Sequence, residues 1–277
     1  MVSLGQIRRG WERIRPFPLP RYASGTPIIG GDQQPRLVQI PNVMTFAAAA
    51  TSGEANQFVA SIMEKLSSSA TAEGQYAYYR LSQGQFGEYW RYADLPTALW
   101  AAATLIDPTN YLEVGVRRGR SAAVLAALRP DCAIYGFDLW VDDYAGDPNP
   151  GPEFVREELR KVGHRGSVEL VSGDSKDTVP AFLREHPALY FDVITVDGDH
   201  SLIGAATDLA NALPRLKVGG ILLFDDIARA RILKRVWAKA VKRDSRFVTW
   251  EFTDVGYGIG AAIRIGDRPL LVAMRPR

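Results

Sequence analysis

Apolar positions along the chain follow two spacings, and these predict a series of strands and helices. Residues 111–114 form a short strand that leads into a turn bracketed by two glycines. Residues 121–128 then carry apolar side chains at helical spacing, and residues 133–137 form a second apolar run that ends on Asp138. This order of strand, glycine turn, helix, strand and acid predicts a βαβ unit that holds a nucleoside.

The same alternation of spacings continues beyond this unit. Further strands are expected at residues 167–171, 191–196, 221–224, 246–252 and 259–265. Helices are expected at residues 54–67, 95–106, 154–162, 179–185, 202–216 and 228–241. Residues 75–87 are aromatic and contain glycine, which predicts a loop, and Val218–Gly220 predicts a turn. Parallel βα repeats closed by a hairpin predict a Rossmann-like α/β fold: a seven-stranded, mostly parallel sheet with an antiparallel last strand and helices on both faces.

The beginning of the chain has a different composition from the rest. Prolines recur between Pro16 and Pro41 at a density that forbids long helices. We therefore divide the chain into a Pro- and Arg-rich extension (1–50), a helical lead-in (51–108) and the nucleoside-binding domain (109–277). The extension is expected to be either a cap or dimer arm near the substrate pocket or a loosely docked tail. The anchors of such a cap would be Trp11, Phe17, Tyr22 and Phe46.

Composition narrows the class of protein without naming a function. The chain has 277 residues and a net charge of +2, which gives no argument for a nucleic-acid partner. Its one cysteine, Cys132, excludes an internal disulfide and a cysteine metal cluster. No run approaches the roughly 20 apolar residues of a membrane span, and arginines interrupt any secretory signal near the start. We expect a cytoplasmic protein with a small-molecule ligand and no membrane partner, and a homo-oligomer stays an open alternative.

The glycine turn departs from the fingerprint of dinucleotide-binding proteins. Arg117 stands where G-x-G-x-x-G has its second glycine, and Glu113 precedes Gly115 by two residues, where pyrophosphate would be repelled. An acid with few glycines suits a cationic ligand that carries a ribose, and S-adenosylmethionine has both features. Asp138, at the tip of the second strand, is placed to accept hydrogen bonds from two ribose hydroxyls.

Three more motifs follow predicted strands: Gly173-Asp174-Ser175, Asp197-Gly-Asp-His200 and Asp225-Asp226. With Glu113-Val-Gly115-x-x-x-Gly119-x-Ser121 and Asp138, they make residue 111 to about residue 265 resemble a class I S-adenosylmethionine-dependent methyltransferase. The branch resembled includes macrolide-sugar O-methyltransferases and cephalosporin-hydroxylase-like proteins, many of which bind a divalent metal. Relatives often carry a longer segment after the final acid pair, whereas here the chain runs straight into a helix.

The resemblance implies a role for each matching residue. The methionine part of the cofactor would lie among Glu113, Gly115, Gly119 and Ser121, and Asp138 would bind the ribose. Asp174 and Ser175 would contact the adenine. The metal ligands would be Asp197, Asp225 and Asp226, with Asp197 also beside the cofactor and His200 as general base. Outside the matched motifs, Trp140 is a candidate to stack on the purine and Tyr144 to face the substrate.

Strand geometry supports a metal site independently. In this fold the strands that lead into Asp197 and Asp225 are neighbours, about 4.8 Å apart, so three carboxylates would converge beside the cofactor. They would repel one another unless a hard cation such as Mg²⁺ joined them. Structural alternatives exist for single acids: Asp174 and Asp226 as helix caps, and Asp199 as a turn residue. Tyr78, Tyr79, Trp90 and Tyr92 either cover the ligand or pack in the core.

These features together predict a Mg²⁺-dependent O-methyltransferase. Its acceptor would be a small hydroxylated molecule, such as a sugar or aromatic moiety of a secondary metabolite in antibiotic biosynthesis. One alternative is a metal-independent or N-directed methyltransferase that uses the same cofactor pocket. The other is a non-catalytic protein that binds the cofactor and acts as an interaction partner. Glu113 and Arg117 disfavour an oxidoreductase.

Overall fold

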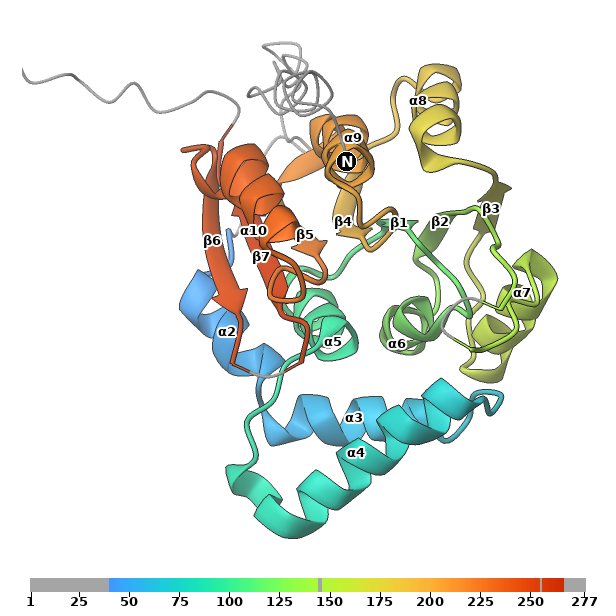
Figure 1. Cartoon of the computed structure of the whole chain (residues 1–277), viewed down its shortest axis with the longest axis vertical. Coiled ribbons are helices and arrows are strands. Elements are labelled where there is room, and N and C mark those ends of the chain that lie inside the picture. Colours follow the sequence, from blue (N-terminus) through green and yellow to red (C-terminus); the bar gives the residue numbers. More distant parts are fainter. Residues whose placement is uncertain (1–39, 144–145, 255, 267–277) are drawn as a thin grey trace, which may run out of the picture.

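Seven strands form one sheet at the centre of the computed structural model, which describes residues 40–143, 146–254 and 256–266 (Figure 1). The strands are β1 Asn110–Val114, β2 Ala133–Asp138, β3 Val168–Ser172, β4 Phe191–Val196, β5 Leu216–Phe224, β6 Phe247–Phe252 and β7 Ile259–Arg264. Their order is β3-β2-β1-β4-β5-β7-β6, with β7 antiparallel to both of its neighbours. The predicted α/β fold with an antiparallel last strand is confirmed.

Helices cover both faces of the sheet (Figure 1). One face carries α2 Val43–Ala50, α5 Leu95–Ile106, α6 Arg120–Leu128 and α7 Pro152–Lys161. Helices α3 Gly53–Met63 and α4 Ala70–Phe86 form a further layer beyond α5 and α6. The other face of the sheet carries α8 Ser175–Glu185, α9 Leu202–Ala212 and α10 Arg231–Trp237, which continues into a π-helical segment, Ala238–Lys242. Each face has its own buried apolar cluster, because the parallel strands are apolar on both sides. None of the described helices is both long enough and apolar enough to cross a bilayer.

Two local expectations were wrong. Residues 75–87 are mostly the helix α4 rather than a loop; Ser69 caps its start by accepting from the backbone N–H of Ala72. The helix was missed because most of its surface is exposed and it lacks an apolar stripe. The expected turn at Val218–Gly220 is an irregularity inside β5, where pairing to β4 jumps from Phe191–Leu216 to Val193–Ile221. Gly219 supplies the positive φ of 83° that this bulge needs.

The aromatic residues of the helical lead-in lie mainly in the buried core. Tyr79 is fully buried and Trp90 nearly so, and Trp90 stacks on Tyr92 with ring centroids 5.3 Å apart. Phe46 is fully buried in α2 and packs against Phe252 of β6. The other expected anchors, Trp11, Phe17 and Tyr22, and the candidate substrate contact Tyr144, lie outside the described residues. The division of the chain into three segments stays a prediction.

Candidate active site

The carboxyl ends of four parallel strands bring the predicted site residues to one edge of the sheet. Glu113 lies in β1, Asp138 ends β2, Asp197 follows β4 and Asp225 follows β5. Because β2, β1, β4 and β5 are consecutive and parallel in the sheet, these ends lie side by side. Open α/β sheets bind ligands at this edge, and the switch point between β1 and β4 falls in the middle of the set.

The turn after β1 passes so close to the turn after β4 that a side chain would not fit. Gly115 has φ 88°, and a Cβ there would lie 2.0 Å from the carbonyl oxygen of Asp197. Gly119 has φ 71°, and its Cβ would lie 2.8 Å from Val155 Cγ1. Both glycines are therefore required by the fold, because the space of each missing side chain is filled by the chain itself.

Glu113 is a buried acid with one unused oxygen. Its side chain is fully buried, and burial raises the pKa of its carboxyl to about 8. The hydroxyl of Ser121 donates to Oε1, which opposes that shift. Oε2 has no hydrogen-bond partner among the described residues. An unsatisfied buried carboxylate oxygen is costly, so the position suits a ligand that brings a positive charge or a donor.

Asp138 holds the glycine turn through backbone contacts. It accepts hydrogen bonds from the backbone N–H groups of Val116 at 2.8 Å and Arg117 at 2.6 Å. Its other oxygen accepts from the backbone N–H of Trp140 at 2.6 Å. Since a carboxylate offers about four acceptor positions, capacity remains for a ribose hydroxyl. The indole N–H of Trp140 donates to Ser172 Oγ at 2.9 Å.

The two predicted adenine contacts are engaged elsewhere in the fold. Asp174 caps α8 by accepting from the backbone N–H of Lys176, and Lys176 Nζ lies 3.1 Å from its carboxylate. The hydroxyl of Ser175 donates to Asp208 Oδ1 at 2.6 Å. Asp208 is fully buried, so Ser175 supports the packing of α8 against α9. The structure thus gives both residues a structural role, and their contact with adenine stays a prediction.

A histidine joins two of the predicted metal-binding acids. His200 Nε2 lies 3.3 Å from Asp197 Oδ1 and 3.3 Å from Asp226 Oδ2. Within the described residues these three side chains form the one group of potential ligand atoms that all lie within 4.8 Å of one another. The hydrogen bond to Asp197 and the charges of both acids raise the pKa of His200. Burial raises the pKa of Asp197, and the hydrogen bond to His200 opposes it.

Asp226 is not the cap of the helix that follows. The residue that precedes α10 is Ala230, which makes no side-chain cap. Asp226 instead has φ 62°, a nearly buried carboxylate, and an ion pair with Arg229 at 2.9 Å. Asp199, in contrast, accepts hydrogen bonds from the backbone N–H and the hydroxyl of Ser201. It therefore shapes the turn before α9, as expected of a turn residue.

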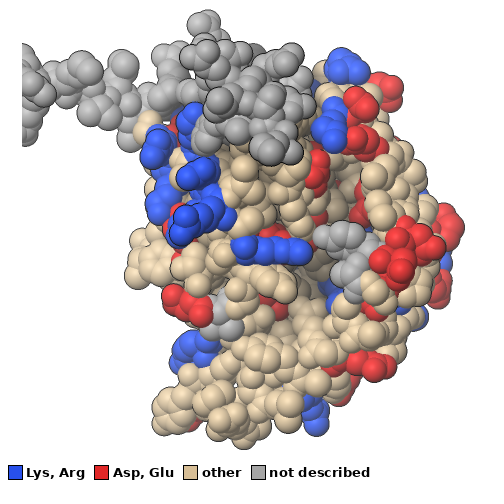
Figure 2. Space-filling model, in the orientation of Figure 1, with Lys and Arg blue, Asp and Glu red and all other residues tan. Residues whose placement is uncertain are grey.

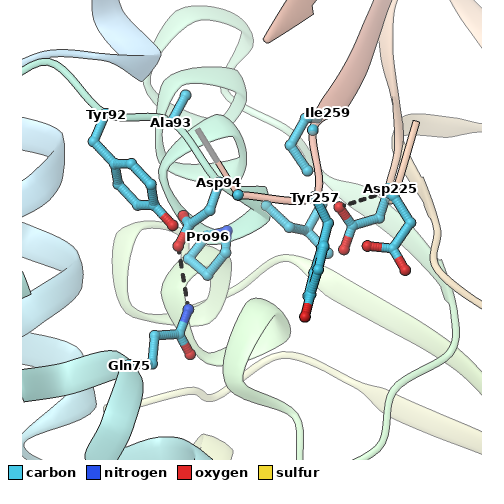
Figure 3. Close-up of a pocket in the computed structure, with 12 residues that line it drawn as sticks. Gln75, Tyr92, Ala93, Asp94, Pro96, Asp225, Tyr257 and Ile259 are labelled. Atoms are coloured by element: carbon cyan, nitrogen blue, oxygen red, sulfur yellow. Dashed lines mark hydrogen bonds between the residues drawn. The ribbon is translucent and has the colours of Figure 1, made fainter. Parts of the chain in front are cut away.

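A cavity of about 270 Å³ opens next to this group (Figure 3). Asp225 and Asp226 form one part of its wall, Tyr92 and Asp94 another, and Tyr257 projects from the β6–β7 connection. Asp94 accepts from Tyr79 Oη at 2.8 Å, from Gln75 Nε2 at 3.2 Å and from the backbone N–H of Thr97. Asp225 accepts only from the backbone N–H of Asp226 among the contacts of the described residues, and burial raises its pKa well above the usual range.

Sequence reasoning missed most of the residues that line this cavity. Gln75, Asp94 and Tyr257 received no role, although Tyr92 was considered as a ligand cover. Asp94 had a local signal, because an Asp followed by Leu-Pro-Thr is typical of a helix start and the residue does cap α5. Asp94 also orients Gln75 at the cavity wall. This contact depends on α4 and could not be predicted from the residues around Asp94 in the sequence.

Comparisons with known proteins match part of the chain to a methyltransferase domain. Residues 112–227 match the family model described as a methyltransferase domain. A curated relative, 8-demethyl-8-(2,3-dimethoxy-alpha-L-rhamnosyl)-tetracenomycin-C 4'-O-methyltransferase of Streptomyces olivaceus, is 30% identical over 146 residues. That match covers 44% of this chain and 54% of the relative, so the chain spans about half the length of that protein.

Solved structures share the fold at low sequence identity. The O-methyltransferase TomG from Streptomyces achromogenes, in complex with SAM, is 19% identical with a TM-score of 0.51, covering 73% of this chain and 92% of TomG. Cofactor-bound Rv0187 from MTB is 20% identical with a TM-score of 0.50, covering 84% and 99% of the two chains. Residues 112–227 thus match a methyltransferase domain, and the chain shares its fold with these two structures.

Proposed function

From the methyltransferase domain at residues 112–227, we propose that this chain is an S-adenosylmethionine-dependent O-methyltransferase for a small hydroxylated molecule. The observation that carries the proposal is the placement of an acid–histidine–acid group between the glycine turn and a cavity of about 270 Å³. A sugar of a secondary metabolite is the first candidate acceptor. The name of the curated relative, a 4'-O-methyltransferase of a rhamnosyl tetracenomycin, supports this choice.

The residues at the glycine turn fit S-adenosylmethionine. The unused Oε2 of Glu113 would receive the ammonium of its methionine part, and the remaining acceptor capacity of Asp138 would receive ribose hydroxyls. Gly115 and Gly119 would contribute backbone contacts from the turn whose conformation they allow, with Ser121 holding Glu113 in place. When bound, the cofactor supplies a methyl group on a positively charged sulfur. Trp140, Asp174 and Ser175 remain the proposed contacts of the adenine end.

The acids beside the cavity fit a divalent cation. Asp197, Asp225 and Asp226 are the proposed ligands, and Mg²⁺ is the first candidate because all of them offer oxygen. Burial and mutual repulsion raise the pKa of Asp225, and a cation would remove that cost. When bound, the cation supplies Lewis-acid activation of the acceptor hydroxyl. His200, 3.3 Å from Asp197, is then the proposed base, taking the hydroxyl proton on its imidazole ring.

The cavity itself supports a single ring as the methylated part. Its volume of about 270 Å³ lies just below the roughly 300–1,000 Å³ of pockets that hold drug-sized ligands. Gln75 and Tyr92 place an amide and a hydroxyl on one side, and the Tyr257 ring lies on the other. Such a mixture of polar groups and one aromatic face suits a sugar ring, with an aromatic phenol as the second choice.

The turnover of the wild-type protein and of a His200→Ala variant tests the proposal. Purified protein would be incubated with S-adenosylmethionine and a panel of deoxysugar glycosides and catechols, in Mg²⁺ or EDTA, and products detected by mass spectrometry. We expect Mg²⁺-dependent methylation, and a loss of about 10²–10⁴-fold in the His200→Ala variant with S-adenosylhomocysteine affinity within about threefold of wild type. His186→Ala is the matched control, since that ring stacks on Phe182 in α8.

Other outcomes separate the alternatives. Full turnover in EDTA would favour the metal-independent enzyme, and methylation of amines alone would favour the N-directed one. Binding of S-adenosylhomocysteine without methylation of any acceptor would favour the non-catalytic interaction protein. Full activity of His200→Ala would contradict the role of His200 as base.

A further inference from the structure

One wall of the cavity holds polar groups that the reaction at the metal-binding acids does not use. Asp225 and Asp226 line one side of the cavity, and Gln75, Tyr92 and Asp94 line another (Figure 3). The hydroxyl to be methylated is assigned to the first side. The second side would therefore meet a different part of the same acceptor.

Asp94 fixes the polar groups around it. Its Oδ1 accepts from the hydroxyl of Tyr79 at 2.8 Å and from the backbone N–H of Thr97 at 3.1 Å, and its Oδ2 accepts from Gln75 Nε2 at 3.2 Å. Burial, then the charge of Asp94, raises the pKa of Tyr92, and a hydrogen bond to that carboxylate contributes. The cap of α5 requires only the Thr97 contact. The remaining contacts orient the side chains that face the cavity.

The amide of Gln75 is held at both ends. Its Oε1 accepts from Arg120 Nη1 at 3.3 Å, and its Nε2 donates to Asp94. A guanidinium group can only donate and an ionised carboxylate can only accept, so these two partners fix which way the amide points. Because Nε2 carries two N–H groups, one donor is left over from the contacts of the described residues, and it lies at the cavity wall.

The ring of Tyr92 is also fixed. It stacks on Trp90 with the ring centroids 5.3 Å apart and the planes at 6°, and its backbone carbonyl accepts from Asn56 Nδ2 at 3.5 Å. Gly256, from the β6–β7 connection, leaves the space in front of the hydroxyl open, since a Cβ there would lie 3.9 Å from Tyr92 Oη. With its proton directed to Asp94, the hydroxyl presents its oxygen to the cavity as an acceptor.

One donor and one acceptor that contact the same carboxylate match a hydroxyl group, which accepts one hydrogen bond and donates another. We propose that Gln75 and Tyr92 bind a second hydroxyl of the acceptor, on the same ring as the hydroxyl that is methylated. The acceptor is then a ring with at least two hydroxyls, such as a hexose, and a ring with a single hydroxyl is a poor substrate. The inference rests on the proposed function, since it takes this cavity as the acceptor site.

Sugars that differ in one hydroxyl test the subsite. Methyl α-L-rhamnopyranoside and each of its monodeoxy analogues would be assayed for methylation with S-adenosylmethionine and Mg²⁺, and kcat/KM compared. In wild type, we expect no product from the analogue that lacks the methylated hydroxyl. The analogue that lacks the bound hydroxyl should lose about 30-fold in kcat/KM, as is typical when a buried polar group is left unpaired.

Variants of the two side chains then assign that loss. In Tyr92→Phe and Gln75→Leu the ratio of kcat/KM between the parent glycoside and the second analogue should fall to about threefold or less, while kcat/KM of the analogue itself changes little. Tyr78→Phe is the matched control and should keep the wild-type ratio. Tyr78 packs against Tyr92 with the ring centroids 5.1 Å apart, but it is not among the described residues that line the cavity.

The outcomes keep the two proposals apart. Failure of wild type to bind S-adenosylhomocysteine would overturn the proposed function. Binding of S-adenosylhomocysteine without methylation of the rhamnoside would overturn the second-hydroxyl subsite alone, and so would equal kcat/KM for the parent and every analogue that is methylated. Neither result needs a variant to fold. An unchanged ratio in both variants, with wild-type affinity for S-adenosylhomocysteine, would overturn the roles of Gln75 and Tyr92.

Discussion

Cofactor binding should release a proton from Glu113. The carboxyl is fully buried and its pKa is raised to about 8, so it is mainly neutral at pH 7 in the free protein. The ammonium of S-adenosylhomocysteine beside Oε2 would favour the ionised form, as an opposite charge within a few ångströms does. The proton then leaves to the buffer, provided that the ligand keeps its own.

The pKa of Glu113 determines how many protons are released on binding. With a pKa of about 8, roughly nine-tenths of Glu113 is protonated at pH 7 and half at pH 8. If binding returns the pKa to about 4.5 or below, about 1 proton is released at pH 6, about 0.9 at pH 7 and about 0.5 at pH 8. The apparent affinity should rise about ninefold from pH 6 to pH 7, because less free energy is spent on deprotonation.

Calorimetry in buffers of different ionisation enthalpy measures this release directly. The observed binding enthalpy changes linearly with the buffer enthalpy, and the slope is the number of protons exchanged. The titration would be run at pH 6, 7 and 8 with wild type and with Glu113→Gln. The variant keeps the shape of the side chain and cannot titrate, so its slope should be near zero and its affinity lower.

Two results would refute the reasoning. A slope near zero for wild type at all three pH values would mean that Glu113 is already ionised in the free protein or stays neutral in the complex. An equal slope in Glu113→Gln would assign the proton to another group. His200 is the first candidate, because its pKa is raised by Asp197 and Asp226.

Two further predictions concern stability. Gly115→Ala should lower the free energy of unfolding by about 2 kcal/mol or more, since its Cβ would meet the Asp197 carbonyl at 2.0 Å and φ is 88°. Gly84→Ala, where a Cβ meets open space within α4, should raise the free energy of unfolding by about 0.5–1 kcal/mol. Urea unfolding measures both variants, and equal effects would contradict the close approach of Gly115 to Asp197. Mg²⁺ at ten times its Kd should add about 1.4 kcal/mol to wild type and nothing to Asp226→Asn. Thermal unfolding with and without the ion checks this, and an equal gain in the variant would exclude Asp226 as a ligand.

The parallel strands could be predicted from the sequence because each is short, rich in apolar residues and bounded by turn residues. The bounds of β4, 191–196, agree with the expectation, and so do those of α5, whose start Asp94 and Pro96 mark. Helix α4 could not be read in this way. It holds its place through its Ser69 cap and the contacts of Gln75 and Tyr79 with Asp94, not through an apolar stripe.

The residues of the site could be predicted from the sequence where strand order alone determines their position. Parallel strands end at one edge, so Asp197 and Asp226 were expected to meet, and they lie on either side of His200. Side-chain direction was not predictable. The carboxylate of Asp225 lies outside the group that His200 joins and lines the cavity instead. The contacts of buried Asp147 could not be predicted either, because its hydrogen-bond partners Ser69 and Thr71 lie 78 and 76 residues away in the sequence.

The most direct test of the central claim is the affinity of the purified protein for S-adenosylhomocysteine, compared with NAD in the same calorimeter. The account predicts micromolar binding of S-adenosylhomocysteine and no measurable binding of NAD, since Glu113 would repel a pyrophosphate and Arg117 replaces the second glycine of the dinucleotide fingerprint. Tight binding of NAD, or no binding of S-adenosylhomocysteine, would contradict the assignment of this fold to methyl transfer.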